Sequence, residues 1–291
     1  MGKIEKSILD QLTPKQRAVA LVLLFVVGAA ITLVQSCRKE AAPPREPGGT
    51  PGQTLADRNV RFGTPAPEPK DHHFIERAQY ALSYSDAKKT ANWVCWNLTK
   101  ADIGNAKRQA SFEPDPLLPK SFLHVKHSDY TGSGFDRGHL CPSKDRSDSD
   151  ENNAATFYTT NIVPQAPKCN QGGWERFESH CRDLTRDGSS LYVVCGPHGE
   201  GGEGTNGRVT TVGKPKVSVP ASVWKVVLVL PSADAVPNRD TKTLAVWMPN
   251  DQTVPEDWKP YQTTVADVER RTGYTFFPLL PADVAAAIKG R

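Results

Sequence analysis

The sequence predicts an α+β fold in which helices flank a substantial antiparallel sheet, and three observations support this prediction. Several short segments are rich in β-branched and aromatic residues, which favour strands. A few other segments place apolar residues at helical spacing. The 291 residues include 22 Gly and 24 Pro, which indicates many turns and argues against a helical bundle. Such a mixture of elements is typical of α+β domains.

The first 37 residues differ from a globular domain, because basic residues precede an uncharged apolar run at 18–34. Its 17 residues reach the lower limit for a membrane-spanning helix. We favour an uncleaved signal anchor; a lipoprotein signal ending at Cys37 and a cleaved signal peptide are the alternatives. Each of them takes the rest of the chain out of the cytosol. We therefore expect a membrane-anchored, extracytoplasmic protein at the cell surface or in the periplasm, or a secreted one if the segment is cleaved.

Residues 38–70 have the composition of a linker. Seven of these 33 residues are Pro and four are Gly. Such a segment buries too little apolar surface to offset its chain entropy, and its prolines keep it extended. We expect it to tether a globular domain that spans residues 71–291.

Within this domain the local patterns predict both kinds of element. Strands are expected at 80–83, 93–98, 190–196, 217–219, 223–230 and 244–248. Helices are expected at 150–156, 172–185, 266–272 and 282–288. The clearest helix is 172–185, which has four apolar residues on one helical face, at Trp174, Phe177, Cys181 and Leu184.

The densest polar signal lies between these elements. Asp136-Arg137-Gly138-His139 is followed by Thr160-Asn161-Ile162-Val163-Pro164-Gln165 and then by Asn170-Gln171-Gly172-Gly173-Trp174. The imidazole of His139, on an expected short strand, titrates near neutrality and suits a general base. The amide oxygen of Asn170 is a hard, neutral ligand that suits Mg²⁺, although an asparagine there could also cap the following helix.

Charged side chains around this segment fit chemistry at a phosphate. Glu178 follows Asn170 by two helical turns and could hold the waters around a cation. Arg182 lies four residues after Glu178 on the same helical face. Arg137 lies two residues before His139, on the same side of an extended segment. A base, a hard cation and arginines together predict phosphodiester hydrolysis.

Together these motifs resemble the DNA/RNA non-specific endonuclease family, whose members have a ββα-metal (His-Me finger) site. The resemblance covers roughly residues 75–285 and includes segments outside the site. Among these are Arg108-x-x-x-Phe112-x-x-Asp115, Trp224-Lys225 and Gly273-x-x-Phe276-Phe277-Pro278. It implies a ββα-metal nuclease fold with a central antiparallel sheet flanked by helices. It also implies metal-dependent hydrolysis of DNA and RNA to 5′-phosphate ends, and a possible homodimer.

The resemblance also implies a role for each matching residue. His139 is the expected general base, and Asn170 the sole direct protein ligand of Mg²⁺, with Mn²⁺ possible. Glu178 is expected to orient the water shell of the cation. Three arginines are expected to contact phosphate or stabilise the transition state: Arg108, Arg137 and Arg182. Asn161 is expected to support the site, for instance by holding the histidine loop. Some members carry a further asparagine where this chain has Phe157.

Two other functions stay open at this point: a nucleic-acid-binding module that has lost catalysis, and an envelope or interaction protein. The formal net charge of +4 does not decide between them. Residues 1–70 hold 10 Lys+Arg and 6 Asp+Glu, whereas residues 71–291 hold 26 of each. Attraction of a nucleic acid must therefore come from local clustering of arginines. Five of the six cysteines lie in the domain, where an oxidising compartment would permit up to two disulfides.

Overall fold

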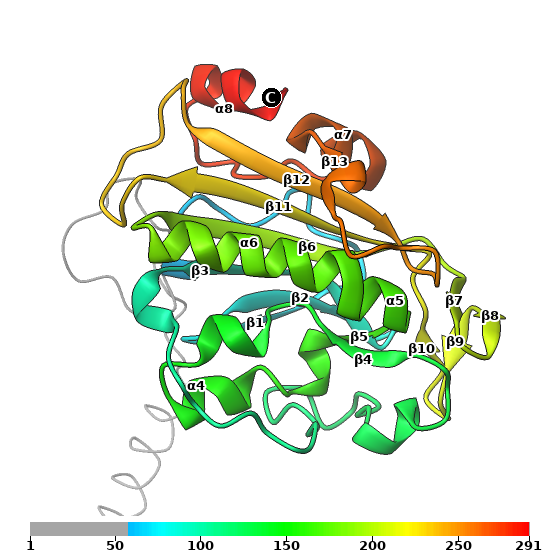
Figure 1. The fold of residues 1–291 in the computed structure, drawn as a ribbon. Coiled ribbons are helices and arrows are strands. Elements are labelled where there is room, and N and C mark those ends of the chain that lie inside the picture. Colours follow the sequence, from blue (N-terminus) through cyan, green and yellow to red (C-terminus); the bar gives the residue numbers. More distant parts are fainter. Residues whose placement is uncertain (1–57, 291) are drawn as a thin grey trace, which may run out of the picture. The chain divides into compact units, whose positions relative to one another are not determined.

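The computed structural model describes residues 58–290 (Figure 1). The apolar run at 18–34 and Cys37 lie outside this part of the chain. Within residues 58–290, none of the helices combines the length and the apolar character needed to cross a bilayer.

A central antiparallel sheet of seven strands organises the domain, in the order β1-β2-β3-β6-β11-β12-β13. Its strands are β1 (His73–Glu76), β2 (Ala81–Ser85), β3 (Thr90–Leu98), β6 (Ser190–His198), β11 (Ser222–Leu230), β12 (Lys242–Pro249) and β13 (Gln262–Thr263). Three small ribbons accompany it: β4 (Asp136–His139) with β5 (Ile162–Gln165), β7 (Gly202–Gly204) with β8 (Gly207–Val209), and β9 (Thr211–Val212) with β10 (Val217–Ser218). The expected strands are confirmed, with ends shifted by a few residues.

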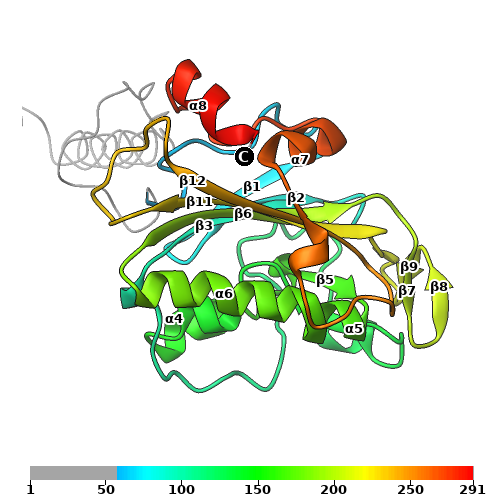
Figure 2. The same cartoon turned by 45° about the horizontal axis from the view of Figure 1, so that its top comes forward.

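Helices cover both faces of the sheet (Figure 2). The α-helices are α4 (Asp150–Ala155), α5 (Pro167–Cys169), α6 (Glu175–Arg186), α7 (Val265–Thr272) and α8 (Ala282–Lys289). Short 3₁₀ turns occupy Lys100–Asp102, His127–Tyr130, Ser143–Arg146, Thr159–Asn161 and Lys259–Tyr261. The helix α6 lies across one face, with α4, α5 and the β4–β5 ribbon, and α7 and α8 lie against the other.

Each face of the sheet has its own apolar core. The core under α6 joins Trp96, Val193 and Val227 of the strands to Trp174 and Phe177. The opposite core contains the alternate strand residues and the apolar sides of α7 and α8. Because both faces are covered, the central strands are buried almost throughout, and all nine residues of β3 are buried.

The strongest helix prediction is correct in type and wrong in its start. The helix α6 begins at Glu175, and one π-helical turn, Asn170–Trp174, precedes it. Gly172 interrupts the helical backbone there with φ −96° and ψ −120°. A Cβ atom on Gly172 or Gly173 would lie 3.1 Å from the carbonyl oxygen of Pro255. A side chain at either position would thus press on this loop, and the apolar period of the sequence does not reveal that contact.

The expected boundary between linker and domain at residue 71 is also wrong, because residues from 58 onward pack on the domain. Phe62 is buried and makes an edge contact with Tyr192, with ring centroids 4.5 Å apart. Arg58 forms an ion pair with Asp102. The side chain of Asn59 donates to the carbonyl of Ala78 at 3.0 Å. These partners lie far away along the chain, so the polar and proline-rich composition concealed them.

The five cysteines of the described domain are all buried and unpaired. Burial raises the pKa of Cys169, Cys181 and Cys195 to about 12, which keeps these thiols protonated. The up to two disulfides that the sequence permitted are not formed among residues 58–290.

Deletion of residues 58–70 should destabilise the domain. Burial of Phe62 alone is worth about 3 kcal/mol, judged from Phe→Ala substitutions in protein cores. We expect a fragment of residues 71–291 to unfold at a clearly lower temperature than one of residues 58–291. Phe62→Ala in the longer fragment should reproduce part of that loss. Equal melting temperatures, measured by circular dichroism, would show that residues 58–70 are a linker after all.

Candidate active site

The β4–β5 ribbon and the segment leading into α6 bring the polar motifs together. His139 ends β4 and pairs with Ile162 of β5, while Gly138 pairs with Val163. A Cβ atom on Gly138 would lie 2.6 Å from the Cβ of Gln165, so only glycine allows this close pairing. Two short strands followed by α6 form the ββα unit that the sequence predicted.

A cavity of about 310 Å³ lies where these elements meet. Five of the seven predicted site residues line it: Arg108, Arg137, His139, Asn170 and Glu178. The rest of the lining consists of Pro142, Ser143, Lys144, Gln171, Glu175 and Arg176. Residues separated by as many as 70 positions in the sequence thus share one polar cavity.

The ring of His139 is enclosed by aromatic side chains. Its centroid lies 4.7 Å from that of Phe157 and 5.3 Å from that of Phe112. The Nε2 atom is buried and has no hydrogen-bond partner among the described residues, which leaves Nδ1 as the nitrogen that can meet the cavity. Burial, and then the positive charge of Arg108, lower the pKa of His139 to about 3. The imidazole is therefore neutral near pH 7 and able to accept a proton.

Asn170 is oriented by a carboxylate. Its Nδ2 donates to Oδ2 of Asp136 at 2.8 Å, and Nε2 of Gln171 donates to the same oxygen at 2.8 Å. With its nitrogen committed to Asp136, the amide has its carbonyl oxygen left to serve as a ligand. Asn170 makes no capping hydrogen bond, so the N-cap alternative is wrong.

Glu178 lines the cavity from the first turn of α6 and is 9% exposed. Its Oε1 accepts a hydrogen bond from Nζ of Lys225 at 2.9 Å. Burial raises the pKa of Glu178, while the charges of Lys225 and Arg182 oppose that rise. The carboxyl group is thus held in a confined position and lines the same cavity as Asn170.

Two arginines of the cavity are held by aromatic rings. The Arg108 guanidinium lies 5.1 Å from the Phe157 ring centroid, and its Nη1 donates to Oγ of Ser143 at 2.6 Å. Nη2 of Arg137 donates to the carbonyl of His127 at 2.9 Å and to Oγ1 of Thr131 at 2.8 Å. Neither arginine forms an ion pair with a carboxylate among the described residues, so both charges remain available to an anion.

Arg182 does not line the cavity, contrary to the prediction that it contacts phosphate. Its guanidinium is 2% exposed and donates from Nη1 to Oδ1 of Asp145 at 3.0 Å. Its Nη2 lies 3.4 Å from Oε1 of Glu175. The spacing from Glu178 correctly placed both residues on one helical face, but Asp145, which faces Arg182 from another segment, was not foreseen.

Asn161 also lies behind the cavity, fully buried. Its side chain accepts from the backbone N–H of Cys141 and donates to the carbonyl of Cys141, both at 2.9 Å. A further bond at 2.9 Å reaches the carbonyl of Thr156. Asn161 therefore fixes the segment directly after His139, the kind of contact expected of a supporting residue.

Sequence reasoning missed two buried charged residues next to the site, Asp145 and Lys225. Asp145 accepts from Arg182 and, at 3.1 Å, from Nε1 of Trp96. A signal existed for Lys225, since a lone lysine inside the apolar strand β11 requires an anionic partner. No comparable signal distinguished Asp145 from the other acidic residues of its polar segment.

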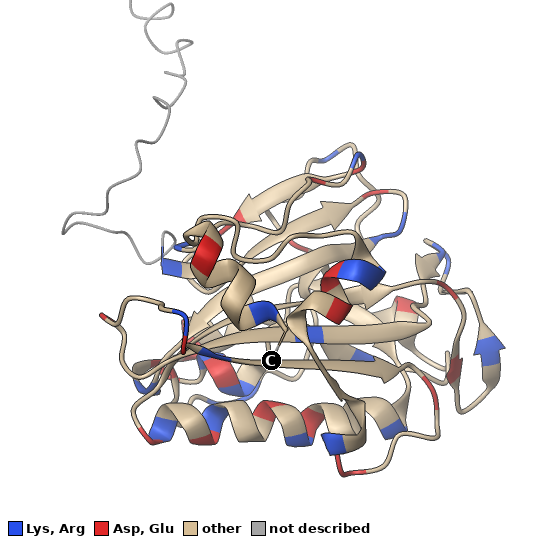
Figure 3. Ribbon diagram, turned by 90° about the horizontal axis from the view of Figure 1, so that it is seen from above, with Lys and Arg blue, Asp and Glu red and all other residues tan. Residues whose placement is uncertain are grey.

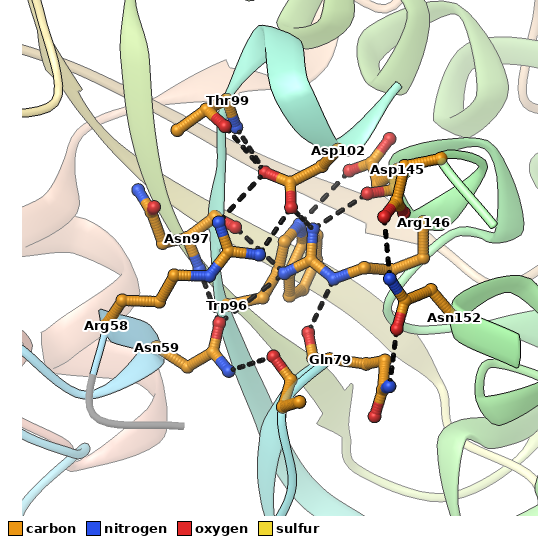
Figure 4. A network of polar contacts seen from close by, with 12 residues as sticks. Arg58, Asn59, Gln79, Trp96, Asn97, Thr99, Asp102, Asp145, Arg146 and Asn152 are labelled. Atoms are coloured by element: carbon orange, nitrogen blue, oxygen red, sulfur yellow. Dashed lines mark hydrogen bonds and ion pairs between the residues drawn. The ribbon is translucent and has the colours of Figure 1, made fainter. Parts of the chain in front are cut away.

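Arg146, next to Asp145, is the centre of a larger buried network (Figure 4). Its guanidinium donates to the carbonyl oxygens of Gln79 at 2.7 Å and Asn97 at 2.8 Å. It lies 3.6 Å from Oδ1 of Asp102, which also pairs with Arg58. The turn after His139 is thereby joined to β3 and to the N-terminal edge of the domain.

These residues fit a divalent cation held by few protein ligands. Among residues 58–290 no group of three or more His, Cys, Asp and Glu side chains is arranged as a metal site. The cavity offers instead the amide oxygen of Asn170 with the carboxylate of Glu178 nearby. Such a set suits Mg²⁺, which keeps several of its waters.

Comparison with known proteins agrees with this arrangement. The sequence profile of the DNA/RNA non-specific endonucleases matches residues 58–283. The chain belongs to this family. A Nostoc sp. protein named Nuclease is 38% identical over 271 residues, which cover 91% of this chain and 96% of that protein. The human protein named Nuclease EXOG, mitochondrial, is 31% identical over 292 residues, covering 94% of this chain and 76% of its own.

A solved structure extends the likeness to the fold. This chain matches a crystal structure of EndoG in complex with EndoGI, which describes the mechanism of EndoG inhibition. The TM-score is 0.69 and the sequence identity is 26%. The match covers 84% of this chain and 99% of that one. The family and the fold together establish this chain as a metal-dependent nuclease with the ββα-metal architecture.

The low pKa of His139 predicts a loss of stability in acid. Below the ordinary pKa of 6.5 the unfolded chain binds a proton at this residue, while the folded chain does not until about pH 3. The free energy of unfolding should therefore fall as the pH drops from 6.5 toward 3. Between pH 7 and pH 5 this residue should contribute a loss of about 2 kcal/mol, at 1.4 kcal/mol per pH unit.

His139→Gln, which does not titrate, isolates this contribution. Urea unfolding of both proteins at several pH values gives the two pH dependences. Parallel curves for wild type and variant would contradict the low pKa.

The Asp136 contact predicts a second outcome. Asp136→Ala frees the amide of Asn170 to rotate, and loss of a residue that orients a ligand typically weakens metal binding 10–100-fold. Titration calorimetry with MgCl₂ or MnCl₂ on the full chain measures this. Gln171→Ala is the matched control, because it removes the other hydrogen bond to Asp136 and leaves that of Asn170 intact. Equal weakening in both variants would contradict the orienting role.

Proposed function

We propose that this nuclease hydrolyses phosphodiester bonds of both DNA and RNA, with Mg²⁺ or Mn²⁺ as its cofactor, and leaves 5′-phosphate ends. The observation that carries the proposal is one cavity lined by a neutral imidazole, an oriented amide oxygen and two arginines without carboxylate partners. The names of the relatives, nucleases of bacterial and mitochondrial origin, support the same substrate class.

In the proposed reaction His139 accepts the proton of the attacking water, and Nδ1 is the atom that can do so. Asn170 would hold the cation through its amide oxygen, and Glu178 would accept hydrogen bonds from the waters around it. When bound, the cation supplies charge neutralisation at the 3′-oxygen that leaves. Arg108 and Arg137 contact the non-bridging phosphate oxygens, where negative charge accumulates.

Low sequence selectivity follows from this set of contacts. All the groups proposed to act on the substrate address the phosphate and the water that attacks it, and phosphate contacts carry no sequence information. The bonds of DNA and of RNA present the same phosphodiester to the cavity. The proposed enzyme therefore cuts both polymers.

We also propose that the domain acts outside the cytosol, tethered to a membrane. The support is the apolar run at 18–34, which lies outside the described residues. Fractionation of cells that express the full chain, with and without residues 1–37, would test the anchor. The homodimer expected from the resemblance stays a prediction, which sedimentation of the purified chain would test.

The central test uses supercoiled plasmid and single-stranded RNA with the full chain. We expect degradation of both with Mg²⁺ or Mn²⁺ and none with chelator. His139→Ala should slow cutting by roughly 10²–10⁴-fold, the usual share of general acid–base catalysis. The matched control is His180→Ala, because His180 packs on Trp258 and does not line the cavity. Binding of DNA without cutting by the wild type would favour an inactive binding module instead.

A further inference from the structure

Lys225 occupies an unusual place for a charged residue. It lies inside the central strand β11, between apolar neighbours, and is 1% exposed. It does not line the cavity. A buried ammonium group is costly unless it has a compensating partner, so its presence requires an explanation.

Within residues 58–290 its one ion-pair partner is Glu178, with 2.9 Å between Nζ and Oε1. The ammonium group also lies 4.3 Å from the ring centroid of Trp174 and 5.3 Å from that of Trp96. The two aromatic faces confine the end of the side chain. Its position is therefore fixed from both sides, by the rings and by the carboxylate.

This contact divides the two oxygens of Glu178 between two tasks. Oε1 is held by Lys225, on the side of the sheet. Oε2 accepts no hydrogen bond from the residues at 58–290, and the side chain lines the cavity. The carboxylate thus meets the cavity with one oxygen, while the other is anchored to a strand that cannot move without disturbing the sheet.

Stability alone does not account for the pair. Replacement of a buried ion pair by apolar residues of similar volume is often neutral or stabilising. The core between β11 and α6 offers apolar surface to such residues at 225 and 178, beside the buried pair of Asp145 and Arg182. The pair is instead placed where one of its members faces the site.

We propose that Lys225 is a positioning residue for the nuclease reaction: it compensates the charge of Glu178 and fixes Oε1, so that Oε2 faces the bound cation and its waters. This proposal rests on the proposed function, which takes the cavity as the site of the cation and of the reaction. Burial raises the pKa of Glu178, and Lys225 is the largest influence that opposes this rise. Loss of the ammonium group would therefore favour a protonated, misplaced acid.

The first test measures metal binding without turnover. Titration calorimetry of MgCl₂ and MnCl₂ into the full chain should show affinity weakened about 10–100-fold by Lys225→Met, as is usual when a residue that orients a metal site is lost. Lys242→Met is the matched control: it removes an exposed lysine from the neighbouring strand β12, and its affinity should equal that of wild type. Asn170→Ala should abolish the signal, which identifies the site being titrated.

The second test is a double-mutant cycle with Glu178→Gln, read as kcat and KM on plasmid DNA. Positioning predicts that Lys225→Met lowers kcat about 10–100-fold with KM within about twofold of wild type. It also predicts no further loss of kcat when Lys225→Met is added to Glu178→Gln, because the carboxylate it positions is gone. An equal loss in both backgrounds, or unchanged metal affinity in Lys225→Met, would overturn the proposal.

Thermal unfolding of each metal-free variant separates folding defects from positioning. Should Lys225→Met not fold, Lys225→Gln takes its place in the cycle, since it keeps a donor for Oε1 and removes the charge. Failure of the proposed function has a different signature. A wild-type chain that binds the cation at Asn170 but cuts no nucleic acid would refute the nuclease mechanism while the binding data still decide on Lys225.

Discussion

The buried ion pair between Asp145 and Arg182 joins the two halves of the site. Asp145 lies in the turn that follows the histidine strand, and Arg182 lies on α6, one turn after Glu178. Their atoms are 3.0 Å apart and both side chains are 3% exposed. Asp145 also accepts from the Trp96 indole of β3. One carboxylate therefore joins the turn after His139 to the helix α6 and to the sheet.

This constraint keeps Arg182, which the resemblance matched to a position that contacts phosphate or stabilises the transition state, out of the cavity lining. A buried guanidinium that already pairs with a carboxylate would leave an unpaired buried charge if it turned to the substrate, which is strongly unfavourable. Arg108 and Arg137 differ, because aromatic rings and neutral acceptors hold them. Their positive charge is oriented in advance and is not neutralised. Acidic and basic residues interleave along much of the ribbon seen in Figure 3, and in the proposed function the attraction for phosphate comes from these two arginines of the cavity.

The sequence predicted most elements and the centre of the site, because those signals are local. His139 and Asn170 stand in dense polar motifs, and the strands carry continuous apolar runs. The errors concern contacts between distant segments. Phe62 belongs to the core through Tyr192, and Arg58 belongs to the domain through Asp102. The start of α6 depends on Pro255, and the role of Arg182 depends on Asp145. No pattern within a window of neighbouring residues contains that information.

Phe157 shows how an apolar residue can serve this polar site. Its ring packs edge-on against His139, and the guanidinium of Arg108 lies over it. Phe157 thus helps to bury His139 and holds Arg108 near it, and burial and the charge of Arg108 are the two causes of the low pKa of His139. A base is most effective when its pKa lies near the working pH, and a pKa near 3 is far below it. A phosphodiester bound in the cavity would offset the charge of Arg108, the smaller of the two causes of this low pKa, and would so move the pKa of His139 upward. In the proposed reaction, proton acceptance by His139 would therefore depend on substrate binding at Arg108.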